Sequence, residues 1–468
     1  MKQVWLDVTT LWHWRSTAVG IVRVEMECAR YALAQGDGAM RFCRFDRLQG
    51  YQEVNTEELA KTLKRLMVSP EQVDLGSPTL NRQALGGHGR LAMYKAFIRS
   101  LLKHLPGAFQ KAIWQFLASR QEGVFAALRT YREGRVALRQ LFFPKPFVAG
   151  SSGFTAKPYA KLRVPFDVSD VYLSMGLDWE RKDLEYLYAQ KRQIGFQVTL
   201  FCYDIIPVKL PQACVSDVAA IFALYFTNVA WCADRILCIS QSSLNDLSTL
   251  LTQLGAPQKS MQVVHLGCDI QRASGYISPE IKTLCEKPFL LFVSTIERRK
   301  NHETLYRAYV ELINQGVVDL PQLLFVGKIG WGVDDLLKDL QLDPRTHSYI
   351  QVLNHVTDAE LAVLYESALF TLYPSLYEGW GLPIAESLAH GKFCLTSNNS
   401  SLPEVGQDYV EYLNAWDVPS WANKIAWYCK NPQALHEKEQ RILANYRATS
   451  WQDSSKSILK SAADLLQS

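Results

Sequence analysis

The sequence lacks the cysteine patterns of metal-binding and secreted proteins. None of its ten cysteines forms a Cys-x-x-Cys pair, and none lies at zinc-ligand spacing from a histidine. Cysteines scattered in this way are typical of small core residues in a reducing cytosol, not of disulfides or zinc ligands. The sequence also contains no Asp-x-Asp motif. Nothing in it requires a bound metal ion, and we expect neither a metal nor a cofactor.

Long hydrophobic runs are also absent. The longest uncharged stretch, residues 218–233, is too short to span a bilayer and is predicted to form a buried helix. Residues 1–7 show a strand pattern and no signal-peptide pattern. With 468 residues, of which 48% are hydrophobic and 21% charged, the chain is expected to fold as two soluble domains. We therefore expect a cytoplasmic protein, with peripheral attachment to the inner face of the cytoplasmic membrane as an open alternative.

Acidic residues are scarce in one segment. Residues 81–145 hold 12 Lys or Arg and only 2 acidic residues, whereas the rest of the chain holds 38 basic and 44 acidic residues. Residues 91–142 show helical spacing in which basic and aromatic residues alternate, a pattern typical of helices that lie on anionic membranes. A solvated helical hairpin would show the same pattern, and both interpretations stay open. Nucleic-acid binding is less favoured, because no recognition motif accompanies the charge.

Strands and helices alternate through most of the chain, with one long interruption. The alternation begins with strands at residues 4–8 and 39–45, lapses over about residues 53–161 and resumes at Asp170. The last strand of this first unit is predicted at residues 262–269, and a linker at residues 274–287 separates the unit from a second alternating one. This order predicts an α/β protein with two doubly wound, Rossmann-like domains, the first of which carries a helical insert.

Candidate site residues follow two predicted strands of the first domain. His13 lies in a loop after the first strand, and Tyr203 and Asp204 follow a strand at residues 197–202. Ligands of doubly wound sheets bind beyond the carboxyl ends of the strands, so these side chains are expected to face a cleft. For His13 a structural or surface role is at least as well supported. Asp204 either orients a substrate hydroxyl or steadies its loop.

The most informative stretch is residues 373–391, Y-P-S-L-Y-E-G-W-G-L-P-I-A-E-S-L-A-H-G. Gly379 and Gly381 allow a ligand to approach the main chain closely. The helix predicted after them offers unpaired N–H groups and a positive end, which together suit a phosphate. The carboxylates of Glu378 and Glu386 can each accept two hydrogen bonds from the paired hydroxyls of a sugar or ribose. The stretch therefore predicts a diphosphate site between two diol-binding carboxylates.

A cationic turn begins the second alternating unit. Residues 289–301, F-L-L-F-V-S-T-I-E-R-R-K-N, form a predicted buried strand that runs into Arg298, Arg299 and Lys300, before a helix capped near Asn301. Considered alone, such a turn is more often simply solvated. If the turn faces the Glu378 loop, its three cations instead favour a diphosphate site.

The spacing of Glu378 and Glu386 resembles the E-x7-E signature of retaining glycosyltransferases of family 4, which have the GT-B fold. Residues 289–301 resemble the G-T-x-E-P-R-K-N motif of the same family, with Ser294 in place of glycine and Arg298 in place of proline. The resemblance is strongest over residues 289–414, and it does not extend to the insert.

The resemblance implies a role for each candidate residue. Glu386 would bind the ribose and Glu378 the sugar hydroxyls of a nucleoside-diphosphate sugar. The other donor-binding residues that it implies are Gly20, Ser294, Thr295, Arg299, Lys300, Val356, Gly379, Gly381 and Leu382. The residues expected to act in catalysis are Glu378, Lys300, Arg299 and Asp204, and those on the acceptor side are His13, Tyr203 and Asp204. The cationic turn could then replace a metal ion on the diphosphate.

The same resemblance implies a domain organisation. Residues 1–280 would form the acceptor-side domain, with the insert at about residues 53–161, and residues 451–468 would complete it as a returning helix. Residues 281–450 would form the nucleotide-sugar domain.

The implied function is transfer of a hexose, with retention of configuration, to a growing and lipid-linked surface polysaccharide. The segment G-I-V-R-V at residues 20–24 and the Tyr203-Asp204 pair look like those of O-antigen mannosyl- or rhamnosyltransferases, which makes GDP-mannose the first candidate donor. Two alternatives stay open. One is a GT-B protein that binds sugar nucleotides without transferring them, and the other is a different GT-B enzyme, such as a nucleotide-sugar epimerase.

Overall fold

The computed structural model describes residues 2–15, 18, 20–36, 40–67, 164–214, 218–268 and 275–467. All of them fall in one of the two compact units into which the chain divides. The basic segment at residues 81–145, and with it the predicted membrane-binding element, lies outside the described residues. Within the described residues, no helix combines the length and the apolar character that crossing a bilayer requires.

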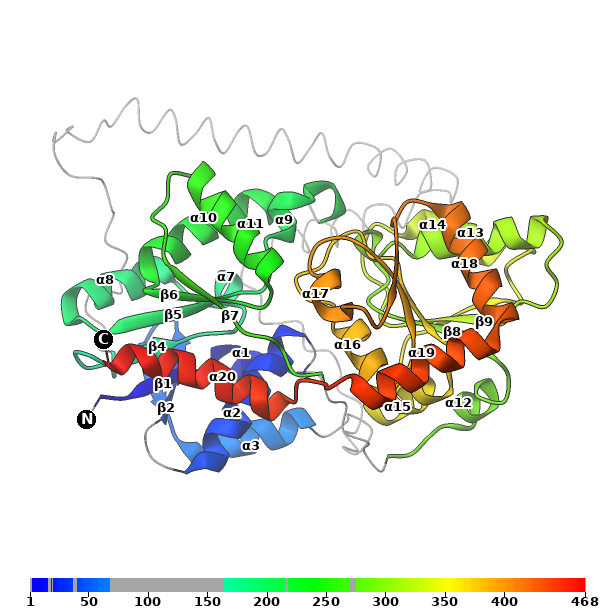
Figure 1. The fold of residues 1–468 in the computed structure, drawn as a ribbon. Helices are drawn as coiled ribbons and strands as arrows, with labels where there is room; N and C mark the ends of the chain where they lie inside the picture. Colours follow the sequence, from blue (N-terminus) through cyan, green and yellow to red (C-terminus); the bar gives the residue numbers. More distant parts are fainter. Residues whose placement is uncertain are drawn as a thin grey trace, which may run out of the picture. The chain divides into compact units, whose positions relative to one another are not determined.

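The first half of the described chain is built on a sheet with the strand order β3-β2-β1-β4-β5-β6-β7 (Figure 1). Its strands are parallel except for β3, which pairs antiparallel with β2. Every residue of β1 is buried, as expected for a parallel strand covered on both faces. The strands are β1 Val4–Asp7, β2 Met40–Asp46, β3 Gly50–Val54, β4 Val171–Leu173, β5 Gln197–Cys202, β6 Arg235–Cys238 and β7 Ser260–Val263.

The second half is built on a parallel sheet with the strand order β10-β9-β8-β11-β12-β13. The central strand β8 has the sequence Phe-Leu-Leu-Phe-Val, and its first four residues are buried. Its neighbours are β9 and β11, so the loops that follow β8 and β11 leave the same edge of the sheet. The strands are β8 Phe289–Val293, β9 Gln322–Val326, β10 Ile350–Leu353, β11 Thr371–Tyr373, β12 Cys394–Ser397 and β13 Glu411–Leu413.

Helices cover both sheets. Those of the first half are α1 Thr9–His13, α2 Ile21–Gln35, α3 Thr56–Met67, α7 Asp178–Arg181, α8 Leu184–Ile194, α9 Ile206–Lys209, η3 Pro211–Ala213, α10 Val218–Cys232 and α11 Gln241–Gln253. Those that follow are α12 Pro279–Leu284, η4 Arg298–Lys300, α13 His302–Asn314, α14 Asp334–Leu342, α15 Asp358–Ser367, α16 Leu382–Ala389, α17 Leu402–Gly406, α18 Val418–Lys430, α19 Pro432–Asn445, α20 Trp451–Ala463 and η5 Asp464–Gln467.

Side-chain caps fix several of the helix ends. The Thr357 hydroxyl accepts from Glu360 N at the start of α15, and the Glu360 carboxylate accepts from Thr357 N, so the two residues form a capping box. At the end of α2, Gly36 adopts a left-handed conformation with φ 62°, which glycine reaches without steric cost.

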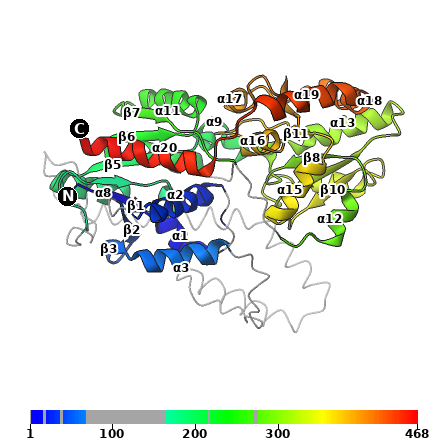
Figure 2. The ribbon, with the colours of Figure 1, turned by 60° about the horizontal axis from the view of Figure 1, so that its bottom comes forward.

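The last helix, α20, returns to the first half of the chain and lies beside α2 (Figures 1 and 2). The Ser454 hydroxyl donates to His265 O at 2.8 Å, and the Ser461 hydroxyl donates to Gln262 Oε1 at 2.5 Å. At Gly267 an added Cβ would lie 2.5 Å from the Cα of Trp451, so only glycine allows this close packing.

Three sequence expectations need correction. The predicted loop after β1 contains a short helix, α1, whose Thr9 N donates to the Asp7 carboxylate at 2.8 Å. Regular structure also continues past residue 53, because β3 and α3 follow β2, and α3 packs against α1 and α2. The strand predicted at residues 262–269 runs instead over Ser260–Val263. Short apolar runs do not by themselves determine where an element begins or ends.

Candidate functional site

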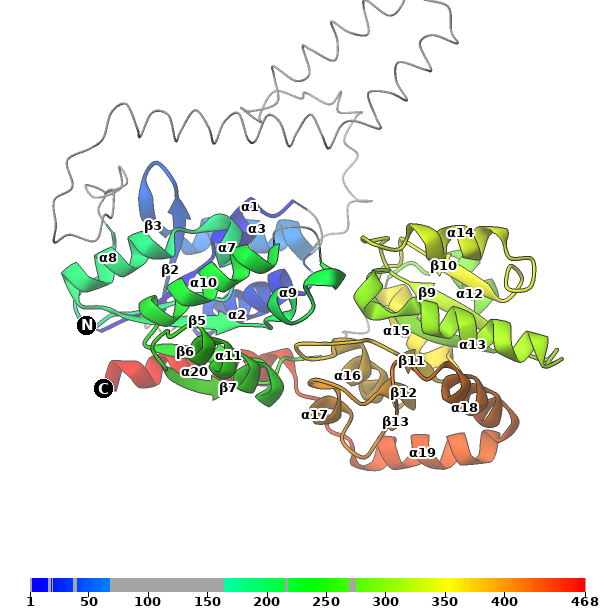
Figure 3. The same cartoon turned by 90° about the horizontal axis from the view of Figure 1, so that it is seen from above.

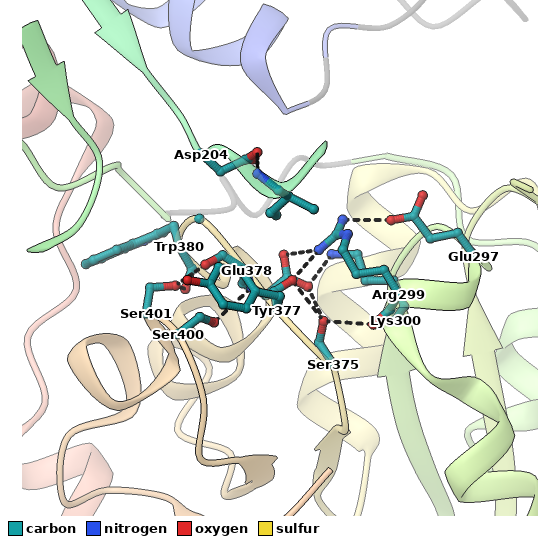
Figure 4. Close-up of polar contacts among 12 residues, drawn as sticks. Asp204, Glu297, Arg299, Lys300, Ser375, Tyr377, Glu378, Trp380, Ser400 and Ser401 are labelled. Atoms are coloured by element: carbon teal, nitrogen blue, oxygen red, sulfur yellow. Dashed lines mark hydrogen bonds and ion pairs between the residues drawn. The ribbon is translucent and has the colours of Figure 1, made fainter. Parts of the chain in front are cut away.

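The cationic turn and the Glu378 loop meet at one edge of the second sheet. Arg299 and Lys300 lie in η4, which follows β8, and Glu378 lies between β11 and α16. Because β8 and β11 are neighbouring parallel strands, their carboxyl ends bring the two loops together. The Lys300 ammonium lies 2.7 Å from Glu378 Oε1, and Arg299 Nη1 lies 2.8 Å from Glu378 Oε2 (Figure 4).

The Glu378 carboxylate is buried among further donors. The Tyr373 hydroxyl donates to Oε1 at 3.0 Å and the Ser375 hydroxyl at 2.5 Å. Burial acts to raise the pKa of Glu378, but the charges of Arg299 and Lys300 outweigh it and hold the pKa at about 2. Glu378 is therefore an anion that fixes the position of both cations.

Arg299 connects two carboxylates and a main-chain carbonyl. Its Nη2 donates to Glu297 Oε1 at 2.7 Å, and its Nη1 donates to Tyr377 O at 2.6 Å. Burial acts to lower the pKa of Arg299, and the charges of Glu378 and Glu297 raise it nonetheless. Burial and the charge of Arg299 together lower the pKa of Lys300, against the opposing effect of Glu378. The two cations and two carboxylates thus form a charge-balanced cluster.

Three serines hold the main chain of the Glu378 loop. Glu378 N donates to the Ser400 hydroxyl at 2.8 Å, and the Ser401 hydroxyl donates to Glu378 O and Trp380 O at 3.0 and 2.7 Å (Figure 4). Ser397 Oγ donates to Ser375 O at 2.5 Å. These bonds fix the direction in which the Glu378 side chain leaves the loop.

The two glycines of the loop are required by the protein's own packing. An added Cβ on Gly379 would lie 2.4 Å from Tyr203 O, and one on Gly381 would lie 2.9 Å from Leu402 Cδ2. Gly381 also has φ 118° and is the N-cap of α16, where Leu382 is the first helical residue. The glycines therefore allow tight packing within the protein, in addition to the close approach of a ligand to the main chain that the sequence predicts.

Glu386 lies on α16, one turn beyond the helix start. Its Oε2 accepts a hydrogen bond from the Tyr365 hydroxyl at 2.9 Å, and Tyr365 is itself almost fully buried. Burial raises the pKa of Glu386, and the Tyr365 hydrogen bond opposes that rise. Tyr365 on α15 thus orients the second carboxylate of the signature.

The predicted donor-side residues outside these loops differ in exposure. Ser294 is buried after β8, where its hydroxyl lies 3.4 Å from His302 Nε2, and burial lowers the pKa of His302 to about 3. Thr295 beside it is exposed, and Val356 packs against the apolar core around β8 and α15. Gly20 is exposed and precedes α2 with φ 53°.

The predicted acceptor-side residues lie at the carboxyl edge of the first sheet. Tyr203 is buried and its hydroxyl donates to Met175 O at 2.6 Å, so its side chain has a packing role. Asp204 Oδ1 accepts from Ile206 N at 2.9 Å; burial raises the pKa of Asp204, and Arg299 opposes this. His13 is exposed at the end of α1, where partial burial and Arg181 lower its pKa.

Several residues of the site were missed by sequence reasoning. Tyr365, Tyr373 and Ser375 contact the carboxylates of the signature directly, and Glu297 contacts Arg299. Ser400 and Ser401 hold the loop from a distant segment. Glu297, Tyr373 and Ser375 lie within the stretches singled out from the sequence, so their position was an available signal. Tyr365 shows no comparable signal, because only folding places α15 beside α16.

Among the described residues, no group of three or more His, Cys, Asp or Glu side chains gathers in a way that could hold a metal ion. The expectation that no metal is needed stays a prediction.

Comparisons with known proteins relate part of the chain to glycosyltransferases. Residues 278–449 match the family model described as Glycosyl transferases group 1. The chain is 26% identical over 282 residues to the serotype-specific mannosyltransferase WbdA of Escherichia coli, and 30% identical over 226 residues to the O-antigen chain mannosyltransferase B of the same organism. The match to WbdA covers 58% of this chain and 34% of WbdA. The match to mannosyltransferase B covers 47% of this chain and 58% of that relative, so the chain spans only part of either protein.

Two solved structures resemble the whole chain. A glycosyltransferase from Rickettsia africae ESF-5 has a TM-score of 0.54 at 14% identity, with 100% of this chain and 99% of that chain covered. HepE from Anabaena, in complex with UDP and glucose, has a TM-score of 0.53 at 13% identity, with 99% and 100% covered. At this level of identity the likeness shows the fold alone. That fold is GT-B, as the sequence predicts.

Proposed function

We propose that this protein transfers a hexose from a nucleoside-diphosphate sugar to a saccharide, because residues 278–449 match the Glycosyl transferases group 1 model and the chain has the GT-B fold. The observation that carries the proposal is the contact of Lys300 and Arg299 with Glu378, at 2.7 and 2.8 Å, next to the start of α16. This site suits a diphosphate joined to a sugar, because cations and a helix N-terminus bind phosphates and a carboxylate binds sugar hydroxyls.

The cluster keeps the capacity to bind an anion. A guanidinium has five N–H donors, and the bonds of Arg299 to Glu297, Tyr377 and Glu378 use three of them. An ammonium has three, and Lys300 directs two of them to Tyr373 and Glu378. The remaining donors would hold the diphosphate while Glu378 keeps both side chains in place. Glu386, oriented by Tyr365, would accept hydrogen bonds from the ribose.

The same cations would stabilise the transition state. Negative charge develops on the departing nucleoside diphosphate as the bond to the sugar breaks, and fixed cations nearby stabilise that charge without reorganisation. Asp204, whose pKa burial raises, would orient the acceptor hydroxyl. Ser294, Thr295, Val356 and the N–H groups at Gly381 and Leu382 would complete the donor site. We propose that transfer retains the anomeric configuration.

The names of the relatives guide the choice of substrate. Serotype-specific mannosyltransferase WbdA and O-antigen chain mannosyltransferase B favour GDP-mannose as the donor and a growing, lipid-linked surface polysaccharide as the acceptor. Since the chain spans only a part of these relatives, the activity of the whole protein is part of the proposal.

A transfer assay tests this function. The purified protein, incubated with GDP-mannose and a mannose-terminated oligosaccharide, should extend the oligosaccharide by an α-linked mannose whose configuration is read by NMR. Parallel thermal-shift measurements with other nucleoside-diphosphate sugars would rank the donors, because a bound ligand stabilises the folded state. Absence of transfer from every donor tested would overturn the proposal, and a β-linked product would overturn retention.

We also propose that the basic segment at residues 81–145 brings the enzyme to an anionic membrane surface on the cytoplasmic side, where a lipid-linked acceptor is found. Twelve basic residues against two acidic ones support this attraction. The protein should bind anionic vesicles at low salt, and deletion of residues 92–141 should abolish binding. Vesicle binding that survives the deletion would contradict the proposal.

A further inference from the structure

A pocket of about 380 Å³ opens in the first half, away from the Glu378 cluster. Helices α7, α8 and α10 and the turn between β2 and β3 supply its walls. Figure 3 shows these three helices together on one face of the first sheet. The pocket has the size of a small-molecule site, and none of the residues predicted from the sequence lines it.

Trp179 of α7 forms a rigid aromatic wall of this pocket. Its ring centroid lies 5.1 Å from that of Phe222 and 5.8 Å from that of Tyr225, in tilted and edge-to-face arrangements. The side chain is only half-buried, so one part packs on α10 and another part borders the pocket. A fixed aromatic face of this kind offers contact area at little entropic cost.

Hydrogen-bonding side chains surround the aromatic wall. The Asn228 amide can both donate and accept, the Arg47 guanidinium donates and the Glu185 carboxylate accepts. A ligand that presents many hydroxyls in varied directions matches such a mixture of donors and acceptors.

The buried cation that borders the pocket, Lys182, is already neutralised by carboxylates of the protein. The side chain of Lys182 is fully buried there, with its ammonium 2.9 Å from Asp178 Oδ1 and 2.7 Å from Asp7 Oδ1. A buried cation paired with two carboxylates has no need of an anionic ligand. This favours an uncharged, polyhydroxylated ligand over a phosphate or a carboxylate.

Residues of the pocket and of the predicted acceptor side follow neighbouring strands of the first sheet. Helix α7 follows β4, and Asp204 follows the neighbouring parallel strand β5, so both leave the same edge of the first sheet. Arg181 of α7 is close enough to His13 to lower the pKa of its imidazole. A chain that extends from the acceptor side would therefore reach the wall formed by Trp179.

We infer that this pocket is a saccharide-binding subsite, in which Trp179 stacks on a sugar ring of the acceptor chain while Asn228, Arg47 and Glu185 bind its hydroxyls. The inference rests on the proposed function, since it makes the pocket a specificity element of the acceptor. The pocket rim includes the exposed Ile221 and Leu224, but the polar lining distinguishes it from a site for a lipid chain.

Direct binding of a mannose oligosaccharide, without any donor, tests the subsite. The Trp179→Ala variant should bind the oligosaccharide roughly tenfold more weakly by calorimetry, and Trp179→Phe should keep most of the affinity. The matched control is Trp231→Ala, because Trp231 is 52% exposed on the same helix as Asn228 but does not line the pocket. Thermal unfolding of all three variants checks that each is folded.

The outcomes separate this inference from the proposed function. If GDP-mannose still stabilises Trp179→Ala while the KM for long acceptors rises, the subsite is supported. If Trp179→Ala binds the oligosaccharide as tightly as the parent protein, the inference is overturned, whether or not transfer occurs. If instead Leu224→Ser weakens binding of lipid-linked acceptors only, and free oligosaccharide does not bind, the pocket is an apolar site and the inference fails.

Discussion

The Tyr365 hydroxyl donates to Glu386 Oε2 at 2.9 Å, and this bond sets the direction of the second carboxylate of the E-x7-E signature. Within the part of the chain that the structure describes, the other oxygen, Oε1, has no hydrogen-bond partner and can accept from a ligand. If Glu386 binds the ribose, Glu386→Gln should weaken binding of GDP more than binding of a dideoxyribose analogue. Tyr365→Phe should weaken GDP binding less, by about 1 kcal/mol, because it removes one hydrogen bond to the carboxylate and leaves the carboxylate itself.

Calorimetry with both nucleotides measures this difference in each variant. The exposed Glu57 on α3 provides the control, since Glu57→Gln should bind both nucleotides as the parent protein does. An equal loss of affinity for the ribose and dideoxyribose forms in Glu386→Gln would remove the ribose role.

Lys300 should matter for the transition state. Lys300→Ala removes a fixed cation from the point at which charge grows on the leaving group, so kcat should fall by about 10²–10³. The loss of one partner of a buried ion pair should also lower stability by about 3 kcal/mol. Steady-state kinetics and thermal unfolding measure the two effects separately.

Arg307 offers a matched control for Lys300. It is a cation on the following helix, α13, and its side chain is 62% exposed and paired with Glu303. Arg307→Ala should leave kcat unchanged and alter stability by less than about 1 kcal/mol. A kcat for Lys300→Ala as high as that of Arg307→Ala would show that Lys300 takes no part in transfer.

Glu25 should make stability depend on pH. It is fully buried on α2, and burial raises its pKa from 4.5 to about 8 despite the nearby Lys182. Between these values the folded state holds more protons than the unfolded state, so Glu25 lowers stability progressively as pH rises from about 4.5 to about 8. Glu25→Gln keeps an oxygen that can accept from Leu11 N and removes this titration.

The melting temperature of Glu25→Gln, relative to the parent protein, should therefore rise with pH across that window and level off above it. Glu57→Gln, at an exposed position, should follow the parent protein throughout. A constant difference between Glu25→Gln and the parent protein from pH 5 to 8 would mean that Glu25 does not titrate there.

Activity should persist in excess EDTA. Arg299 and Lys300 supply two positive charges at one point, which can take the place of a metal ion on the diphosphate. Transfer assays with EDTA, with and without added magnesium, measure this. Loss of activity in EDTA that magnesium restores would refute it.

Much of the fold could be predicted from the sequence. Runs such as Phe-Leu-Leu-Phe-Val in β8 are apolar along their whole length, which is typical of parallel strands covered on both faces. The start of α16 after Gly381, with Pro383 in its first turn, and the capping box at Thr357 and Glu360 follow local rules that act within a few residues. Where such signals are missing the prediction failed: α1 was predicted as a loop, and the end of β7 was misplaced.

The chemical components of the site were also determined by the sequence alone. Residues 298–300 and the pair Glu378 and Glu386 show their charge and spacing in the printed sequence. The charge of each side chain, and its position beside a strand end or a helix start, indicate which part of a nucleoside-diphosphate sugar it could bind.

Only the tertiary structure decided which of these components meet. Strand order is set by the packing of whole strands, and the pairing of β8 with β11 joins Lys300 to Glu378 across 78 residues of sequence. The same holds for Ser400 and Ser401, which hold the Glu378 loop, and for α20, which returns to the first sheet. Such contacts depend on the geometry of distant elements, and no local pattern of residues encodes them.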